Sequence, residues 1–87
     1  MDARQLTDFK DQHALGSLRL RRSCERLLAA AEADGRKADA RKMATQLRQV
    51  QKMITQYGIE AYAVSRGLEL EPYDETEIEI ARAGVVR

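Results

Sequence analysis

The chain holds a single histidine, His13, and a single cysteine, Cys24, two residue types that often bind metals or act as nucleophiles. On a helix, their spacing puts both side chains on one face but about 16 Å apart along the axis, too far to share a metal ion. No Ser/His/Asp or Cys/His set has a spacing that would assemble a catalytic site, and no glycine-rich phosphate loop is present. We therefore expect a protein that is not an enzyme and uses no cofactor or metal.

Charge is divided unevenly along the chain. Residues 1–57 carry 12 Lys or Arg against 7 Asp or Glu, whereas residues 58–87 carry 3 against 7, for a net charge of +1. The basic half offers a candidate anion-binding or nucleic-acid-binding face, with a solvated face or a dock for the acidic tail as the alternatives. Its residues are Arg19, Arg22, Arg26, Arg41 and Lys42.

The acidic half offers a second candidate surface. Six acids follow one another without a base among them and suit contact with a basic partner surface, or simply keep a terminal segment soluble. These acids are Glu69, Glu71, Asp74, Glu75, Glu77 and Glu79.

An apolar seam organises the second half of the chain. Its members recur at steps of 3 and 4 without a slip, the spacing of a helix packed lengthwise on another helix. They are Ala40, Met43, Leu47, Val50, Ile54, Tyr57, Ala61, Val64 and Leu68. We predict a helix over residues 40–66 that ends at Gly67. Gly58 is an alternative stop, which the seam argues against because it keeps its phase through Ala61 and Val64.

A first helix is predicted over residues 3–33, beginning after Asp2, whose spacing to Gln5 is that of a capping box. The polar stretch Glu32–Lys42, with Asp34-Gly35 inside it, predicts a reversal with a turn over residues 34–39. The two helices then pair antiparallel, with facing residue numbers that add to about 71, and Leu47 lies centrally opposite Cys24. The apolar face of the first helix reads Leu6, Phe9, His13, Ser17 (or Gly16), Leu20, Cys24, Leu27, Leu28 and Ala31.

Several large apolar residues lie off this intrachain seam and predict a second interface, with another copy or another protein. They are Leu15, Leu18, Ile59 and Tyr62. The alternative is that the tail covers them with Leu70, Ile78 and Ile80.

The predicted fold is therefore all-α. Residues 1–67 form a coiled-coil-like antiparallel helical hairpin, and residues 68–87 form an acidic tail that is extended, briefly helical or disordered. At 87 residues the core is small, so we expect a homodimer in the form of a four-helix bundle. No apolar run is long enough for a membrane span, and a lone cysteine suits the cytoplasm.

Gln56-Tyr57-Gly58-Ile59, with Tyr62 following, resembles a segment of a type I-E anti-CRISPR protein family, whose members are small and helical. The resemblance covers these five residues and implies a phage-encoded dimer that inhibits a CRISPR nuclease by binding it. The expected function is a small protein-binding module that acts as an adaptor or inhibitor by occupying a partner's surface. The alternative is a Rop-like helical hairpin that binds nucleic acid through its Arg/Lys face.

Overall fold

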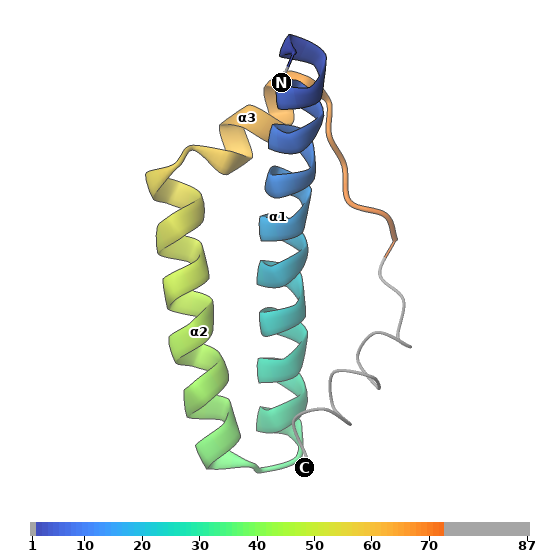
Figure 1. The fold of residues 1–87 in the computed structure, drawn as a ribbon. Coiled ribbons are helices and arrows are strands. Elements are labelled where there is room, and N and C mark those ends of the chain that lie inside the picture. Colours follow the sequence, from blue (N-terminus) through green and yellow to red (C-terminus); the bar gives the residue numbers. More distant parts are fainter. Residues whose placement is uncertain (1, 73–87) are drawn as a thin grey trace.

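The computed structural model describes residues 2–72, and within them the fold is all-helical. Three helices follow in order: α1 (Ala3–Ala33), α2 (Lys37–Gln56) and α3 (Ile59–Arg66). Figure 1 shows α1 and α2 running side by side in opposite directions, with α3 crossing from the end of α2 to α1. The all-α class and the helical hairpin are as predicted. The predicted contacts of Asp74, Glu75, Glu77, Glu79, Ile78 and Ile80 lie outside the described residues.

Local signals set both ends of the first helix. Asp2 accepts a hydrogen bond from the Gln5 amide at 2.9 Å while the Gln5 side chain accepts one from the Asp2 amide, so the predicted capping box is present. At the other end Gly35 takes a left-handed conformation with φ of 70°, which only glycine adopts without cost. The turn is shorter than the predicted residues 34–39, because α2 already begins at Lys37.

The register of the hairpin agrees with the sequence prediction. Arg21 on α1 donates a hydrogen bond to the side chain of Gln51 on α2 at 3.0 Å, and these residue numbers add to 72 rather than 71. The longest dimension of the molecule is 47 Å, about the length of 31 residues of α-helix. The length of α1 therefore sets the length of the fold.

The structure corrects the prediction of one helix over residues 40–66. The helix stops at Gln56, where the Gly58 amide turns back to the Thr55 carbonyl at 3.3 Å and Gly58 itself is left-handed with φ of 61°. The new helix α3 starts in a different rotational phase. Ile59 and Ala63 are buried as a result, whereas Tyr57 and Val64, which the seam predicted to be buried, are 68% and 81% exposed.

The core is narrow along α1 and widest near α3. Small residues of α1 face α2 at spacings of 3 and 4, and the buried ones are Ala14, Ser17, Cys24 and Ala31. Near α3, Ala14, Ile54 and Ile59 form a buried cluster. Ile54 is 1% exposed and takes the central place predicted for Leu47, which is only half-buried.

The predicted apolar face of α1 is confirmed in part. Ser17, Cys24 and Ala31 are buried as predicted, whereas Phe9 is 65% exposed and Leu6 and Leu20 are nearly half exposed. His13, predicted to pack against Tyr57 in the core, is exposed as well. On α1, the face with Leu6, Phe9 and Leu20 thus lies beside the face of smaller residues that packs in the intrachain core.

After Gly67 the chain turns back along α1 (Figure 1). Leu68 packs against the buried cluster, and Arg22 donates a hydrogen bond to the carbonyl oxygen of Glu71 at 2.7 Å. None of the helices in residues 2–72 combines the length and apolarity that a membrane crossing requires.

Candidate protein-binding site

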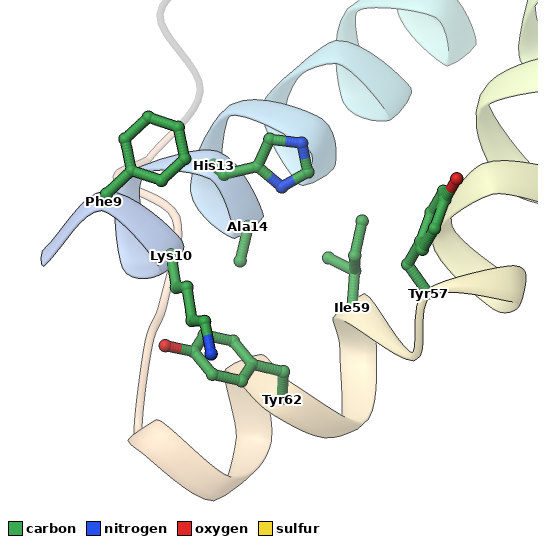
Figure 2. A pocket seen from close by; sticks show the side chains of 7 residues that line it. All are labelled: Phe9, Lys10, His13, Ala14, Tyr57, Ile59 and Tyr62. Atoms are coloured by element: carbon green, nitrogen blue, oxygen red, sulfur yellow. The ribbon is translucent and has the colours of Figure 1, made fainter. Parts of the chain in front are cut away.

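An open groove lies where α1 separates from the end of α2 and α3 bridges the two helices. Its volume is about 380 Å³. Figure 2 shows the side chains that surround it, from α1 on one side and from the α2–α3 connection on the other. These residues are Phe9, Lys10, His13, Ala14, Tyr57, Ile59 and Tyr62. We call this site the aromatic groove.

Aromatic side chains are concentrated here. The whole chain has one phenylalanine, three tyrosines and no tryptophan, and three of these four aromatic residues line the groove. Phe9 and Tyr57 are 65% and 68% exposed, so neither ring is needed for the intrachain core. Ile59 and Ala14 between them are buried. The groove therefore has a fixed apolar floor and two exposed aromatic walls.

The break at Gly58 creates this arrangement. Phe9 and His13 stand one turn apart on α1, so their side chains project from the same face. Tyr57 caps the end of α2, and Ile59 begins α3 two residues later. Tyr57 is 68% exposed at the end of α2, and the left-handed Gly58 turns the residues after it so that Ile59 is buried beside the groove.

A polar cluster fixes α3 against α1 next to the groove. The Tyr62 hydroxyl donates to Asp11 at 2.7 Å, and Arg66 donates two hydrogen bonds to the same carboxylate at 3.1 and 3.0 Å. The guanidinium of Arg66, with help from the Tyr62 hydroxyl, lowers the pKa of Asp11, while the bond to Asp11 raises the pKa of Tyr62. We call Asp11, Tyr62 and Arg66 the α3 clasp.

A second set of contacts holds α3 from the other side. Arg21, at a half-buried position of α1, forms an ion pair with Glu60 on α3 and a longer one with Glu25 at 3.8 Å. Its hydrogen bond to Gln51 ties α2 to the same point. Three helices thus meet at one arginine, and the position of α3 is supported at both sides.

The rim of the groove carries a cation and no carboxylate. Lys10 is the basic residue among the seven that line it, and the His13 imidazole can form hydrogen bonds there. The nearby Asp11 carboxylate is held by Tyr62 and Arg66. Such a site suits an apolar or aromatic side chain that is accompanied by a carboxylate.

The predicted second interface of Leu15, Leu18, Ile59 and Tyr62 requires correction. Ile59 is 4% exposed inside the chain, and Leu18 and Tyr62 pack against the buried cluster with it. Leu15 is half-buried. After the change of helical phase at Gly58, Ile59 is buried within the chain, and Tyr62 and Leu68 pack against the same cluster, while Ile59 and Tyr62 also line the aromatic groove.

The predicted basic residues do not form one cluster. Arg19 and Arg26 lie exposed on α1, and between them Arg22 holds the segment that contains Glu71. Arg41 and Lys42 lie exposed at the start of α2, which the hairpin register places level with the end of α1. Of the predicted acidic contacts, Glu69 and Glu71 are exposed.

His13 and Cys24 lie in different surroundings. His13 lines the groove, whereas Cys24 is 3% exposed and its burial raises the pKa of the thiol. Within residues 2–72, no three potential metal ligands among His, Cys, Asp and Glu come together.

Sequence reasoning missed the aromatic groove because it assigned Phe9, His13 and Tyr57 to the intrachain core. Two signals pointed to the site. One was Gly58 at a position where a helix can end, and the other was the small number of aromatic residues in the chain, three of which line the groove. No protein-family model, curated protein or solved structure matches the chain.

Proposed function

We propose that this protein is a small protein-binding module that acts as an adaptor or inhibitor by occupying the surface of a partner through the aromatic groove. One observation carries the proposal: three of the four aromatic side chains gather around one open groove, and Phe9 and Tyr57 are mostly exposed there. Residues of this type dominate binding energy when a partner removes them from water. A chain of this size has few large apolar groups to leave exposed without a use.

The chemistry of the groove defines the kind of segment that it accepts. Ile59 and Ala14 offer an apolar floor, and Lys10 offers positive charge at the rim beside the His13 imidazole. The partner segment that fits is amphipathic, with one or two large apolar side chains next to a carboxylate.

The resemblance to the type I-E anti-CRISPR proteins is in keeping with this proposal. Tyr57, Ile59 and Tyr62 belong both to the resembling segment and to the groove, and Gly58 sets their directions. Inhibition of a CRISPR nuclease by surface binding is accordingly one specific form of the proposed function. Dimerisation into a four-helix bundle is a further part of the proposal, and its interface is argued in the next section.

Binding of two synthetic helical peptides tests the groove. One carries Leu and Phe one turn apart with Glu between them, and its twin carries Lys in place of Glu. We expect the Glu peptide to shift the NMR signals of Tyr57 and Tyr62, and to bind at least about tenfold more tightly than the Lys twin. Equal binding of both peptides, or shifts confined to other surfaces, would contradict the proposed chemistry.

A matched pair of variants assigns the binding energy. Tyr57→Ala removes an exposed ring and should weaken binding of the Glu peptide by about tenfold or more while circular dichroism stays native. Gln49→Ala, an exposed change on the same helix, should leave binding unchanged. If both variants bind like the parent, the groove is not the site.

Nucleic-acid binding is the second candidate, and the composition of α2 favours it. This helix carries five basic residues, Lys37, Arg41, Lys42, Arg48 and Lys52, against the single acid Asp39, which pairs with Arg36 at 2.7 Å. Binding of a short RNA duplex should then fall steeply with salt and weaken further in Arg48→Gln with Lys52→Gln. Absence of RNA binding at low salt would exclude this candidate.

A further inference from the structure

The helix α1 carries a second heptad row beside the one that forms the intrachain core. Its members recur at steps of 3 and 4 along the helix. From His13 onward, each member comes one residue before a position that faces α2. The row is Leu6, Phe9, His13, Gly16, Leu20, Ser23, Leu27 and Ala30. One residue corresponds to a rotation of about 100°, so this row faces sideways from the contact with α2. We call it the lateral row.

The intrachain fold leaves much of the lateral row open. Phe9 is 65% exposed, Leu6 and Leu20 are nearly half exposed, and His13 and Gly16 are exposed as well. A Cβ added at Gly16 would meet no atom within 4 Å, and its backbone is helical. Contacts among residues 2–72 therefore do not explain a glycine in the middle of a helix, where it costs roughly 0.5–1 kcal/mol relative to alanine.

We propose that a second copy of this chain docks on the lateral row, with its α1 antiparallel to the first and the two-fold axis near Leu18. In this register each residue i faces residue 36 − i of the other copy. The facing pairs are then Leu6 with Ala30, Phe9 with Leu27, His13 with Ser23, and Gly16 with Leu20.

The sizes of these pairs favour a second copy as the occupant. Leu6 and Leu20 meet the small residues Ala30 and Gly16, and His13 meets Ser23, so bulky side chains enter spaces that small ones leave. Gly16 finds its explanation here, because it makes room for Leu20 of the other copy. The contact is isologous, as a two-fold axis requires. Two hairpins joined in this way form a four-helix bundle whose interface differs from the one predicted from sequence.

This dimer shares one edge of the aromatic groove with the proposed partner. Its central residues, Gly16 and Leu20, do not line the groove. Phe9 and His13 belong both to the lateral row and to the aromatic groove. In the dimer, Leu27 of the second copy would cover Phe9. A partner would then enter from the side of Tyr57 and Tyr62, over the floor that Ile59 forms.

Sedimentation equilibrium of the full chain tests the dimer. The parent should sediment at about twice its chain mass of 9.9 kDa, and Leu20→Glu should sediment as the single chain with unchanged helicity, since Leu20 is half exposed. The dissociation constant should rise at least about 30-fold, as for a central interface residue. Ala29→Glu is the matched control. It adds the same charge at an exposed position nine residues on, on the opposite side of the helix, and should remain a dimer.

Cross-linking tests the antiparallel register. Gly16→Cys combined with Leu20→Cys should form a disulfide-linked dimer on mild oxidation, because residues 16 and 20 of the two copies face each other. Leu20→Cys alone should not, because the two residues 20 are displaced along the axis. Efficient cross-linking of the single variant would mean a parallel dimer and overturn the register. A parent that sediments as one chain would overturn the dimer. Tyr57→Ala should lose the peptide but keep the dimer, so the two proposals fail separately.

Discussion

The two ends of the hairpin are built in different ways. At the turn, small buried residues such as Cys24 and Ala31 let α1 and α2 approach closely, and Gly35 closes the connection. At the other end, larger side chains such as Ile54 and Ile59 fill the space, and α3 is inserted between the helices. We call the end at Gly35 the closed end, where two helices that follow each other in sequence pair. We call the other end the open end, where α3 packs against α1, from which it is distant in sequence.

The difference shows what a regular apolar pattern can and cannot decide. At the closed end the pattern and the turn signals agree, so local sequence and global fold coincide. At the open end the seam favours a straight helix through Tyr57, Ala61 and Val64, while Gly58 favours a stop. The stop prevails because the rotated α3 buries Ile59 and Ala63 and gains the clasp between Asp11, Tyr62 and Arg66.

Ile54→Ala should have the largest effect on stability. The residue is 1% exposed at the centre of the wide core, and its truncation should cost about 2–5 kcal/mol in urea unfolding. Val64→Ala is the control from the same predicted seam, and its loss should stay within about 0.5 kcal/mol because the side chain is 81% exposed. Similar losses for the two variants would mean that the straight helix is the true structure.

Gly58→Ala should cost less, roughly 1–2 kcal/mol, because alanine resists the left-handed conformation that this position requires. Hydrogen exchange of the α3 amides should become faster in this variant. The control is Gly16→Ala in the monomeric Leu20→Glu background, where the same substitution within a helix should stabilise the protein. Stabilisation by Gly58→Ala would indicate that α2 and α3 can join as one helix.

Asp11→Asn should have the smallest effect of the three and one that depends on pH. The folded protein lowers the pKa of Asp11, so the stabilisation is complete above the ordinary carboxyl pKa of about 4 and is lost as the pH falls through the folded value. The melting temperatures of parent and variant should differ at pH 7 and converge in acid. A difference that persists unchanged at pH 2 would contradict a role for the ionised carboxylate.

Sequence reasoning predicted the closed end of the molecule and the class of the fold. The Asp2 cap, the reversal near Gly35 and the register of Arg21 with Gln51 follow from signals within a few residues or from a single repeat. Such local signals do not decide which of the two apolar rows of α1 becomes the core. Both rows have heptad spacing, and only the positions of α2 and α3 decide which one becomes the intrachain core.

The candidate site was harder to predict for the same reason. Phe9 and Tyr57 are the kind of large apolar residues expected in a core. Phe9 is exposed because α1 turns Ala14 and Ser17 toward α2. Tyr57 is exposed at the end of α2, where the change of phase at Gly58 leaves the inward position to Ile59. Of the predicted interface residues, Ile59 is buried within the chain and Tyr62 packs against the buried cluster, because α3 begins in a different helical phase. One residue corresponds to about 100° of rotation on a helix, so an error of one residue in the phase exchanges the residues predicted to be buried with those predicted to be exposed. When the end of a helix cannot be placed from the sequence, the buried face of the helix that follows cannot be predicted either.

The α3 clasp also bears on how the protein folds. Asp11 and Arg66 are 55 residues apart in sequence, whereas the turn at Gly35 joins helices that are neighbours along the chain. Closing a long loop costs more chain entropy than closing a short one. The pairing of α1 and α2 should therefore begin next to the turn at Gly35 and proceed away from it, and α3 should pack against α1 last. By the same reasoning α3 should be the first part to open when the native protein fluctuates. The aromatic groove then exists only in the completely folded chain, and a partially folded intermediate would expose Phe9 and Tyr57 without presenting a site that a partner recognises.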